Sequence, residues 1–226
     1  MRRAPHEGRR AVRGHPGAVA APLGSLAAVT SPTGPEGLTL SPTPREQLRD
    51  LISEIAVVRG RVTLSSGREA DYYVDLRRIT LHHRASPLVG HLLLDRLEEV
   101  GLGTAEVDAV GGLTLGADPV ATALLHAAAS RGLDLDAFVV RKEGKAHGLQ
   151  RRIEGPDIAG RRVVVVEDTS TTGGSAITAV EAAREAGAEV LGVAVIVDRG
   201  TGAQQAIEAL GVPYHFLFDL TDLGLA

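Results

Sequence analysis

The stretch VVVVEDTSTTGGSAITAV, Val163 to Val180, decides the fold. Four consecutive valines are typical of a strand buried on both faces of a parallel sheet. The alanine-rich end of the stretch has the composition of a helix. Two acids, several hydroxyls and two glycines lie where the strand passes into the helix. Because ligands bind at the carboxyl ends of strands in parallel sheets, the stretch predicts a binding site at this junction.

The rest of the chain repeats this alternation of strand and helix. Valine-rich runs predict further strands at VDAVGG (107–112), LDAFVV (135–140) and VLGVAVIVDR (190–199). Apolar residues at helical spacing predict helices over 87–100, 119–130, 176–186 and 203–210. Strands joined by helices indicate an α/β fold with a mostly parallel central sheet, flanking helices and right-handed crossovers.

The ordered part is expected to begin with a helix and a hairpin. Ser41 or Thr43 can cap a helix whose leucines and isoleucines share one face, and Gly60 is expected to end it. The run RVTLSSGREADYYVDLRR (61–78) then alternates between apolar and polar residues. This pattern predicts a hairpin that turns at Ser66-Gly67.

Residues 1–40 differ in composition from the rest of the chain. They hold five arginines, two glutamates, five prolines and six glycines, and no sustained period of a helix or strand. We therefore predict a disordered tail over 1–40 and one domain over 41–226. The basic start could belong to a secretory signal, but Pro22 and Gly24 interrupt its apolar part.

The composition of the whole chain excludes several classes of protein. The 226 residues include no cysteine, which excludes disulfides and thiolate metal sites. No apolar run approaches the roughly 20 residues that span a bilayer. The net charge of -4 gives no general reason to expect a nucleic-acid partner. We expect a cytoplasmic protein with neither a membrane nor a nucleic acid as partner.

The junction after the valines has the chemistry of a sugar-phosphate site. A helix start offers backbone N–H groups without intrahelical partners and the positive end of the helix dipole, which suit a phosphate. Glu167 and Asp168 would repel a bare phosphate, so they are expected to bind sugar hydroxyls or a hydrated cation. The alternative is a capped helix after a buried strand, with both acids as solvated turn residues. The Walker-type and Gly-x-Gly-x-x-Gly loops are absent.

The segment VVVVEDTSTTGGS resembles the phosphoribosyl-pyrophosphate motif of the type I phosphoribosyltransferases. Two further segments, VRKEGKAHG (140–148) and SSGREADYYVDLRR (65–78), narrow the resemblance to the orotate phosphoribosyltransferases. The resemblance covers about residues 41–226. It implies the type I phosphoribosyltransferase fold, with the N-terminal helix and hairpin as a hood over the site. It also implies transfer of the phosphoribosyl group from phosphoribosyl pyrophosphate to N1 of orotate, in the biosynthesis of UMP.

The resemblance assigns roles to the residues of the junction and of a basic loop. Glu167 and Asp168 are implied to bind the ribose hydroxyls. The turn that is implied to hold the 5-phosphate consists of Thr169, Ser170, Thr171, Thr172, Gly173, Gly174 and Ser175. The loop 141–152 is implied to close over the pyrophosphate with Arg141, Lys142, Lys145 and His147. The residues expected to be catalytic are Lys142, Lys145, His147 and Asp168.

The charges of the loop support this assignment independently. RKEGKAHGLQRR (141–152) holds five cations and a histidine around one glutamate. Cations that meet the leaving pyrophosphate as the bond breaks lower the barrier. The alternative for such a loop is a solvated surface. For His147, the roles of acid, hydrogen-bond donor and bystander stay open.

The resemblance places the orotate base near the hairpin and the end of the last long strand. Thr171 and Arg199 match positions that hold the base, and a guanidinium can pair bidentately with its carboxylate. Arg199 could instead pair with Asp198. Tyr73 falls where the family packs a ring near the base, although core packing would also explain it.

Two positions depart from the family pattern. Many bacterial relatives carry lysine at the positions of Ser65 and Gly116, and this chain does not. Arg77, Arg78 and Arg84 are available as other cations, and the sequence does not choose among them. The loop GGLTLGADP (111–119) still matches the family's place for backbone contact with pyrophosphate.

The resemblance also implies the cofactor and the partners. Mg2+ is expected to arrive with phosphoribosyl pyrophosphate, with no direct protein ligand. The partners are expected to be orotate, phosphoribosyl pyrophosphate and a second copy of the chain, into whose site the loop 141–152 reaches. Two alternative functions stay open. One is a phosphoribosyltransferase for a purine base, and the other is a non-catalytic regulator that senses phosphoribosyl pyrophosphate.

Overall fold

The computed structural model describes residues 41–63, 69–142 and 152–226, and the chain from Ser41 onward forms one compact unit. The predicted tail, the turn at Ser66-Gly67 and most of the basic loop lie outside the described residues. Six strands form the central sheet in the order β5-β4-β3-β6-β7-β8. Their bounds are β3 Ala109–Leu113, β4 Asp136–Val140, β5 Ile153–Glu154, β6 Arg162–Ser170, β7 Glu189–Asp198 and β8 Tyr214–Phe218.

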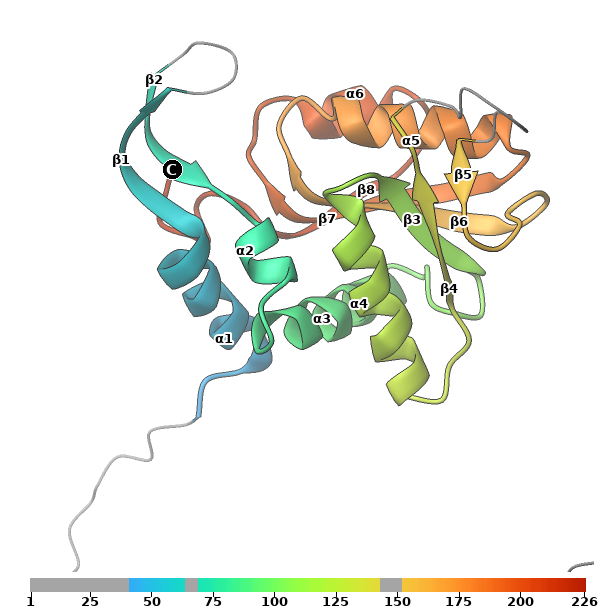
Figure 1. The fold of residues 1–226 in the computed structure, drawn as a ribbon, viewed down its shortest axis with the longest axis horizontal. Helices are drawn as coiled ribbons and strands as arrows, with labels where there is room; N and C mark the ends of the chain where they lie inside the picture. Colours follow the sequence, from blue (N-terminus) through green and yellow to red (C-terminus); the bar gives the residue numbers. More distant parts are fainter. Residues whose placement is uncertain (1–40, 64–68, 143–151) are drawn as a thin grey trace, which may run out of the picture. The chain divides into compact units, whose positions relative to one another are not determined.

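The direction of the strands confirms the predicted sheet. Neighbouring strands from β4 to β8 are parallel, and the short β5 is antiparallel to β4. Helices cover both faces of the sheet (Figure 1). α5 (Gly174–Glu185) and α6 (Ala203–Glu208) lie on one side, and α3 (Ala85–Glu99) and α4 (Ala117–Ser130) lie on the other. These four helices and the three predicted strands occupy the expected segments within a few residues.

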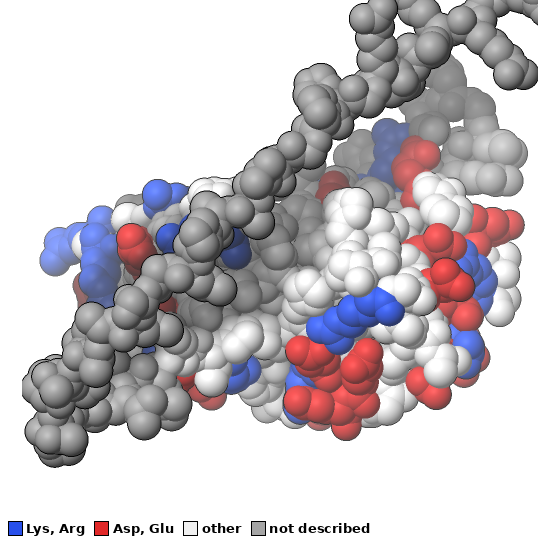
Figure 2. Space-filling view, turned by 90° about the horizontal axis from the view of Figure 1, so that it is seen from below, with Lys and Arg blue, Asp and Glu red and all other residues white. Residues whose placement is uncertain are grey.

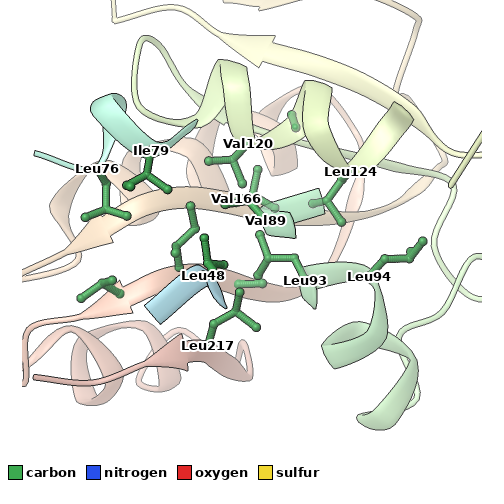
Figure 3. Close-up of a cluster of buried hydrophobic side chains, with 14 of the residues drawn as sticks. Leu48, Leu76, Ile79, Val89, Leu93, Leu94, Val120, Leu124, Val166 and Leu217 are labelled. Atoms are coloured by element: carbon green, nitrogen blue, oxygen red, sulfur yellow. The ribbon is translucent and has the colours of Figure 1, made fainter. Parts of the chain in front are cut away.

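The valines of β6 divide the core into two clusters. Val163 and Val165 pack with α5 and α6, whereas Val164 and Val166 pack with α3 and α4. All four side chains are fully buried, and each burial contributes about 1.5 to 3 kcal/mol. Figure 3 shows Val166 among apolar side chains of the second cluster, which also includes Leu48 and Leu217. The valine run thus joins both helical layers, and β6 continues beyond it through the acidic pair to Ser170.

The N-terminal segment forms a helix and a hairpin beside the sheet. α1 (Pro44–Leu51) begins with a capping box between Thr43 and Glu46, and a short π-helix (Ile52–Ala56) follows it. β1 (Val57–Thr63) then pairs antiparallel with β2 (Glu69–Val74), which confirms the hairpin. The prediction that the helix continues to Gly60 was wrong, because the β-branched residues from Val57 onward pair with β2 instead.

Three short elements were not predicted, which are α2 (Arg77–Thr80), β5 and β8. α2 is a single turn whose Ile79 is buried in the core, next to Leu76. Each of these elements has six residues or fewer, too few to establish a period in the sequence.

The described surface mixes positive and negative charge. Arg131, directly after α4, lies 2.6 Å from Asp95 of α3. Figure 2 shows positive and negative side chains next to one another on the face seen from the side of α3 and α4. Among the described residues, no helix is long and apolar enough to cross a membrane.

Candidate active site

A cavity of about 290 Å³ lies where β2, β3, β4 and β6 end. Its walls come from four segments that are far apart in the sequence. They are residues 73–77 after the hairpin, residues 113–116 after β3, Lys142 after β4, and Glu167, Asp168, Thr169 and Ser175 at the junction of β6 and α5. The cavity therefore occupies the edge of the sheet that the sequence predicted as the ligand site.

The acidic pair forms the floor of this cavity. Glu167 is only 6% exposed, and the Asp168 N–H donates to its Oε1 over 3.2 Å. The Thr169 N–H donates to Asp168 Oδ1 over 2.6 Å. These bonds join each carboxyl group to the backbone N–H of the residue that follows it in β6. Neither acid forms an ion pair with a described residue, so both can accept hydroxyl donors of a ligand.

Burial changes the protonation of this pair. Burial, together with the charge of Asp168, raises the pKa of Glu167 to about 8. Burial also raises the pKa of Asp168, although hydrogen bonds and the charge of Arg77 oppose the shift. Two adjacent buried carboxyl groups cannot both ionise cheaply. At neutral pH the ligand-free pair therefore holds a proton on Glu167.

The turn after the acids leads into the N-terminus of α5. Gly173 has a φ of 81°, a left-handed conformation that L side chains rarely adopt, and it precedes the first residue of the helix. A Cβ at Gly173 would also lie 3.3 Å from Ile207 Cδ1 of α6. The first-turn N–H groups of Gly174, Ser175 and Ala176 have no acceptor within the helix. This end of a 12-residue helix suits an anion, as the sequence predicted.

The loop Thr114–Gly116 closes the cavity opposite the turn. The Thr114 hydroxyl donates to Asp118 Oδ2 over 2.7 Å, and the Thr114 N–H donates to the carbonyl of Val140 over 2.9 Å. Gly116 lies directly against the acidic pair, since a Cβ there would overlap Glu167 Oε1. A side chain at this position would fit only if Glu167 moved.

The base of the basic loop is partly described. The Arg141 N–H donates to the carbonyl of Arg152 over 2.8 Å, and the Arg141 guanidinium lies 3.5 Å from Glu154 Oε1. Lys142 lines the cavity. Lys145 and His147 lie outside the described residues, as does Ser65, so their roles remain predictions.

Several predicted residues do not line this cavity. They are Arg141, Ser170, Thr171, Thr172, Gly173, Gly174 and Arg199. Ser170 is buried beneath the turn and forms a hydrogen bond with Tyr214, whose hydroxyl donates to Asp198 Oδ1 over 3.1 Å. The Arg199 N–H donates to the Ser170 carbonyl over 3.0 Å. The alternative pairing of Arg199 with Asp198 is not present in the described structure.

Two polar lining residues were not assigned from the sequence, because Asp75 received no role and Arg77 was only one of three available cations. Arg77 donates to Asp75 Oδ1 from its backbone N–H over 3.3 Å and from Nε over 3.1 Å. Both residues lie directly after β2, at the edge of the sheet where the other polar strand ends lie. This position in the sequence could have indicated that they belong to the site.

The described residues include no group of three or more His, Cys, Asp or Glu side chains that could hold a metal ion. Mg2+ is commonly bound through one or two carboxylates, waters and substrate phosphates. Glu167 and Asp168 supply such carboxylates beside the anion site, so the residues fit a Mg2+ ion that a phosphorylated ligand brings.

Comparison with known proteins identifies the family. Residues 77–208 match the family described as phosphoribosyl transferase domain. The chain is 68% identical over 182 residues to the orotate phosphoribosyltransferase of Streptomyces avermitilis, which covers 80% of this chain and 97% of that protein.

Solved structures agree with this match. The Mycobacterium tuberculosis orotate phosphoribosyltransferase in complex with Fe(III) dicitrate has a TM-score of 0.73 at 59% identity, over 81% of this chain and all of that chain. The same enzyme in complex with 5-phospho-α-D-ribosyl 1-diphosphate has a TM-score of 0.70 at 54% identity, over the same shares of the two chains. The chain therefore belongs to the phosphoribosyltransferase family with the type I fold, and within it to the orotate phosphoribosyltransferases.

Proposed function

We propose that the protein transfers the 5-phosphoribosyl group from phosphoribosyl pyrophosphate to N1 of orotate. The products are orotidine 5-phosphate and pyrophosphate, in the biosynthesis of UMP. The observation that carries this proposal is the acidic pair Glu167 and Asp168, buried at the end of β6 in one cavity with Ser175 at the start of α5. Carboxylates that can accept from sugar hydroxyls and a helix start that can bind a phosphate thereby line the same cavity.

In the proposed reaction the chain binds both ends of the donor. Glu167 and Asp168 accept hydrogen bonds from the ribose hydroxyls, and the turn from Thr169 to Ser175 holds the 5-phosphate. Arg141, Lys142, Lys145 and His147 belong to the loop that meets the pyrophosphate. Because positive charge develops on the ribose and negative charge on the leaving group, fixed charges on both sides stabilise the transition state.

Mg2+ neutralises part of the pyrophosphate charge when it is bound with the donor. We propose that Glu167 and Asp168 hold the ribose of the donor and that the ion, which arrives with the donor, has no direct protein ligand. Orotate is proposed to bind between Tyr73 and the end of β7, with Thr171 and Arg199 as its polar contacts. Arg199 can pair with the orotate carboxylate through two parallel hydrogen bonds.

We further propose a homodimer in which the loop 141–152 reaches the partner's site. An apolar groove of about 880 Å³ lies between α2, α3 and α4, and Leu81 and Leu115 beside it are 75% and 69% exposed. Exposed apolar area of this kind marks interaction surfaces. Arg77 and Leu115 line both the groove and the cavity, so a partner seated on the groove would adjoin the site.

The dimer has its own test. Leu81→Glu should give a monomer in analytical ultracentrifugation, because it introduces a charge into the apolar contact. Mixing Lys145→Ala subunits with Asp168→Asn subunits should restore part of the activity if the loop acts across the interface. Verified heterodimers without recovered activity would place the loop in its own subunit's site.

We place the reaction in the cytoplasm. Phosphoribosyl pyrophosphate carries several charges and cannot cross a bilayer unaided, so the enzyme has to share the compartment in which this donor is made.

The reaction is tested by loss of orotate absorbance in the presence of phosphoribosyl pyrophosphate and Mg2+, with orotidine 5-phosphate identified as product. Asp168→Asn keeps the shape of the side chain and removes its charge, so it should lower turnover strongly. Glu181→Gln, on the exposed face of α5, is the matched control and should leave turnover unchanged. A wild-type protein that leaves orotate unchanged would refute the proposed reaction.

A further inference from the structure

Arg77 is the first residue of α2, and its guanidinium is held in place by Asp75. The Arg77 N–H and Nε both donate to Asp75 Oδ1, over 3.3 and 3.1 Å. The two side chains are 52% and 25% exposed. Leu76 between them is 1% exposed, which anchors the short segment in the core. This arrangement fixes the direction of the Arg77 side chain through one carboxyl oxygen.

The terminal nitrogens of Arg77 remain available for a ligand. Within the described residues, Nη1 and Nη2 of Arg77 have no hydrogen-bond partner, because the contacts with Asp75 use Nε and the backbone. Arg77 lines the same cavity as Lys142 and the loop Thr114–Gly116. Burial raises the pKa of Asp168 and the charge of Arg77 opposes that rise, so the guanidinium acts electrostatically on the floor of the site.

The described lining of the cavity offers two cations to a pyrophosphate group, Arg77 and Lys142. A pyrophosphate group carries several negative charges, and charge-assisted hydrogen bonds from such cations are the strong ones. Gly116 adds no cation, because it has no side chain. Arg77 is the described arginine that lines the cavity, and its planar fork matches phosphate oxygens.

We propose that Arg77 binds the pyrophosphate group of phosphoribosyl pyrophosphate and that Asp75 is its positioning residue. The inference rests on the proposed function, because it takes that donor as the ligand. It places a cation on the hairpin side of the cavity, which Lys142 after β4 also lines. Asp75 fixes the guanidinium before the ligand arrives.

The test compares two ligands that differ only by pyrophosphate. Binding of phosphoribosyl pyrophosphate with Mg2+, and of ribose 5-phosphate, is measured by calorimetry on folded Arg77→Ala, Arg77→Lys and Arg78→Ala proteins. Arg77→Ala should weaken phosphoribosyl pyrophosphate about 10- to 100-fold, the usual effect of losing a charge-assisted contact, and leave ribose 5-phosphate within about 2-fold. Arg77→Lys should recover part of the loss, because the ammonium keeps the charge without the fork.

Arg78→Ala is the matched control. Arg78 is the exposed neighbour of Arg77 on α2 and does not line the cavity, so its removal should leave both affinities unchanged. If Arg77→Ala binds phosphoribosyl pyrophosphate as tightly as Arg78→Ala, the inference is wrong. It is also wrong if Arg77→Ala weakens both ligands equally. A wild-type protein that binds neither ligand would instead refute the proposed function.

Asp75→Asn tests the positioning role. Asparagine keeps an acceptor oxygen and loses the charge, so the affinity for phosphoribosyl pyrophosphate should fall less than in Arg77→Ala, with ribose 5-phosphate unchanged. In the double variant Asp75→Asn/Arg77→Ala, the Asp75 change should add nothing, because the residue acts through the guanidinium. An additional loss in the double variant, or an equal loss for both ligands, would show that Asp75 acts on the fold rather than on Arg77.

Discussion

Replacing Glu167 by glutamine should make the ligand-free protein more stable in mild alkali. In the unfolded chain the carboxyl group titrates near its ordinary pKa of 4.5, whereas burial and the charge of Asp168 raise its pKa to about 8 in the folded protein. Between these two values the folded state keeps a proton that the unfolded state has lost. The free energy of unfolding therefore falls as the pH rises through this window and becomes level above it.

The structure sets the size of this effect. One bound proton corresponds to about 1.4 kcal/mol of unfolding free energy per pH unit, so the wild-type protein should lose about 3 kcal/mol between about pH 6 and about pH 8. The pKa of Asp168 is also raised by burial, which adds a loss in the same direction at lower pH. Glutamine mimics the protonated carboxyl group and cannot ionise. Glu167→Gln should therefore remove most of the loss above pH 6.

The assay is urea unfolding, followed by circular dichroism, at several pH values from about pH 6 to about pH 9. The control is Glu181→Gln, an exposed residue of α5 with no described hydrogen bond, which should keep the wild-type pH dependence. If wild type and Glu167→Gln lose the same free energy over this range, Glu167 does not carry the proton and the reasoning is refuted.

Three further changes test other parts of the site. Gly173→Ala should destabilise the protein by about 1 to 2 kcal/mol, because the φ of Gly173 is 81°. Gly174→Ala should cost less than about 0.5 kcal/mol, because a Cβ there would meet only Thr172 Oγ1 at 3.9 Å. Thermal unfolding measures both costs, and equal costs would contradict the role of the left-handed conformation at Gly173. Arg199→Ala should lower the specificity constant for orotate about 30-fold or more and leave calorimetric binding of phosphoribosyl pyrophosphate unchanged, and full orotate activity would remove Arg199 from the site. Deletion of residues 1–40 should leave activity and thermal stability nearly unchanged, and a clear loss of either would show that the segment packs on the domain.

The long elements could be predicted because their patterns have physical causes that act locally. Four valines can be buried on both faces only in the interior of a layered sheet, and the acids and glycines that follow mark the strand end. The end of the first helix was misplaced at Gly60 because its true end depends on the pairing of Val57 with Val74, which lies beyond the reach of a local pattern. The cap at Thr43 was correctly included among the candidates because a capping box is local.

Part of the site could be predicted because its residues are neighbours in the sequence. Glu167, Asp168 and Ser175 follow one another closely, so the junction could be recognised from its own residues. Asp75 and Arg77 could not be assigned, because only folding brings the end of the hairpin to the ends of β3 and β6. The close approach of Gly116 to Glu167 likewise depends on a residue about fifty positions later in the chain.

The choice of base tests the central claim most directly. Pyrophosphate release from phosphoribosyl pyrophosphate with Mg2+ is measured with orotate, uracil, adenine and hypoxanthine as acceptors. We predict turnover with orotate and a specificity constant at least about 30-fold lower for uracil, which lacks the carboxylate that Arg199 is proposed to bind. Higher activity with a purine base, or equal activity with orotate and uracil, would contradict it.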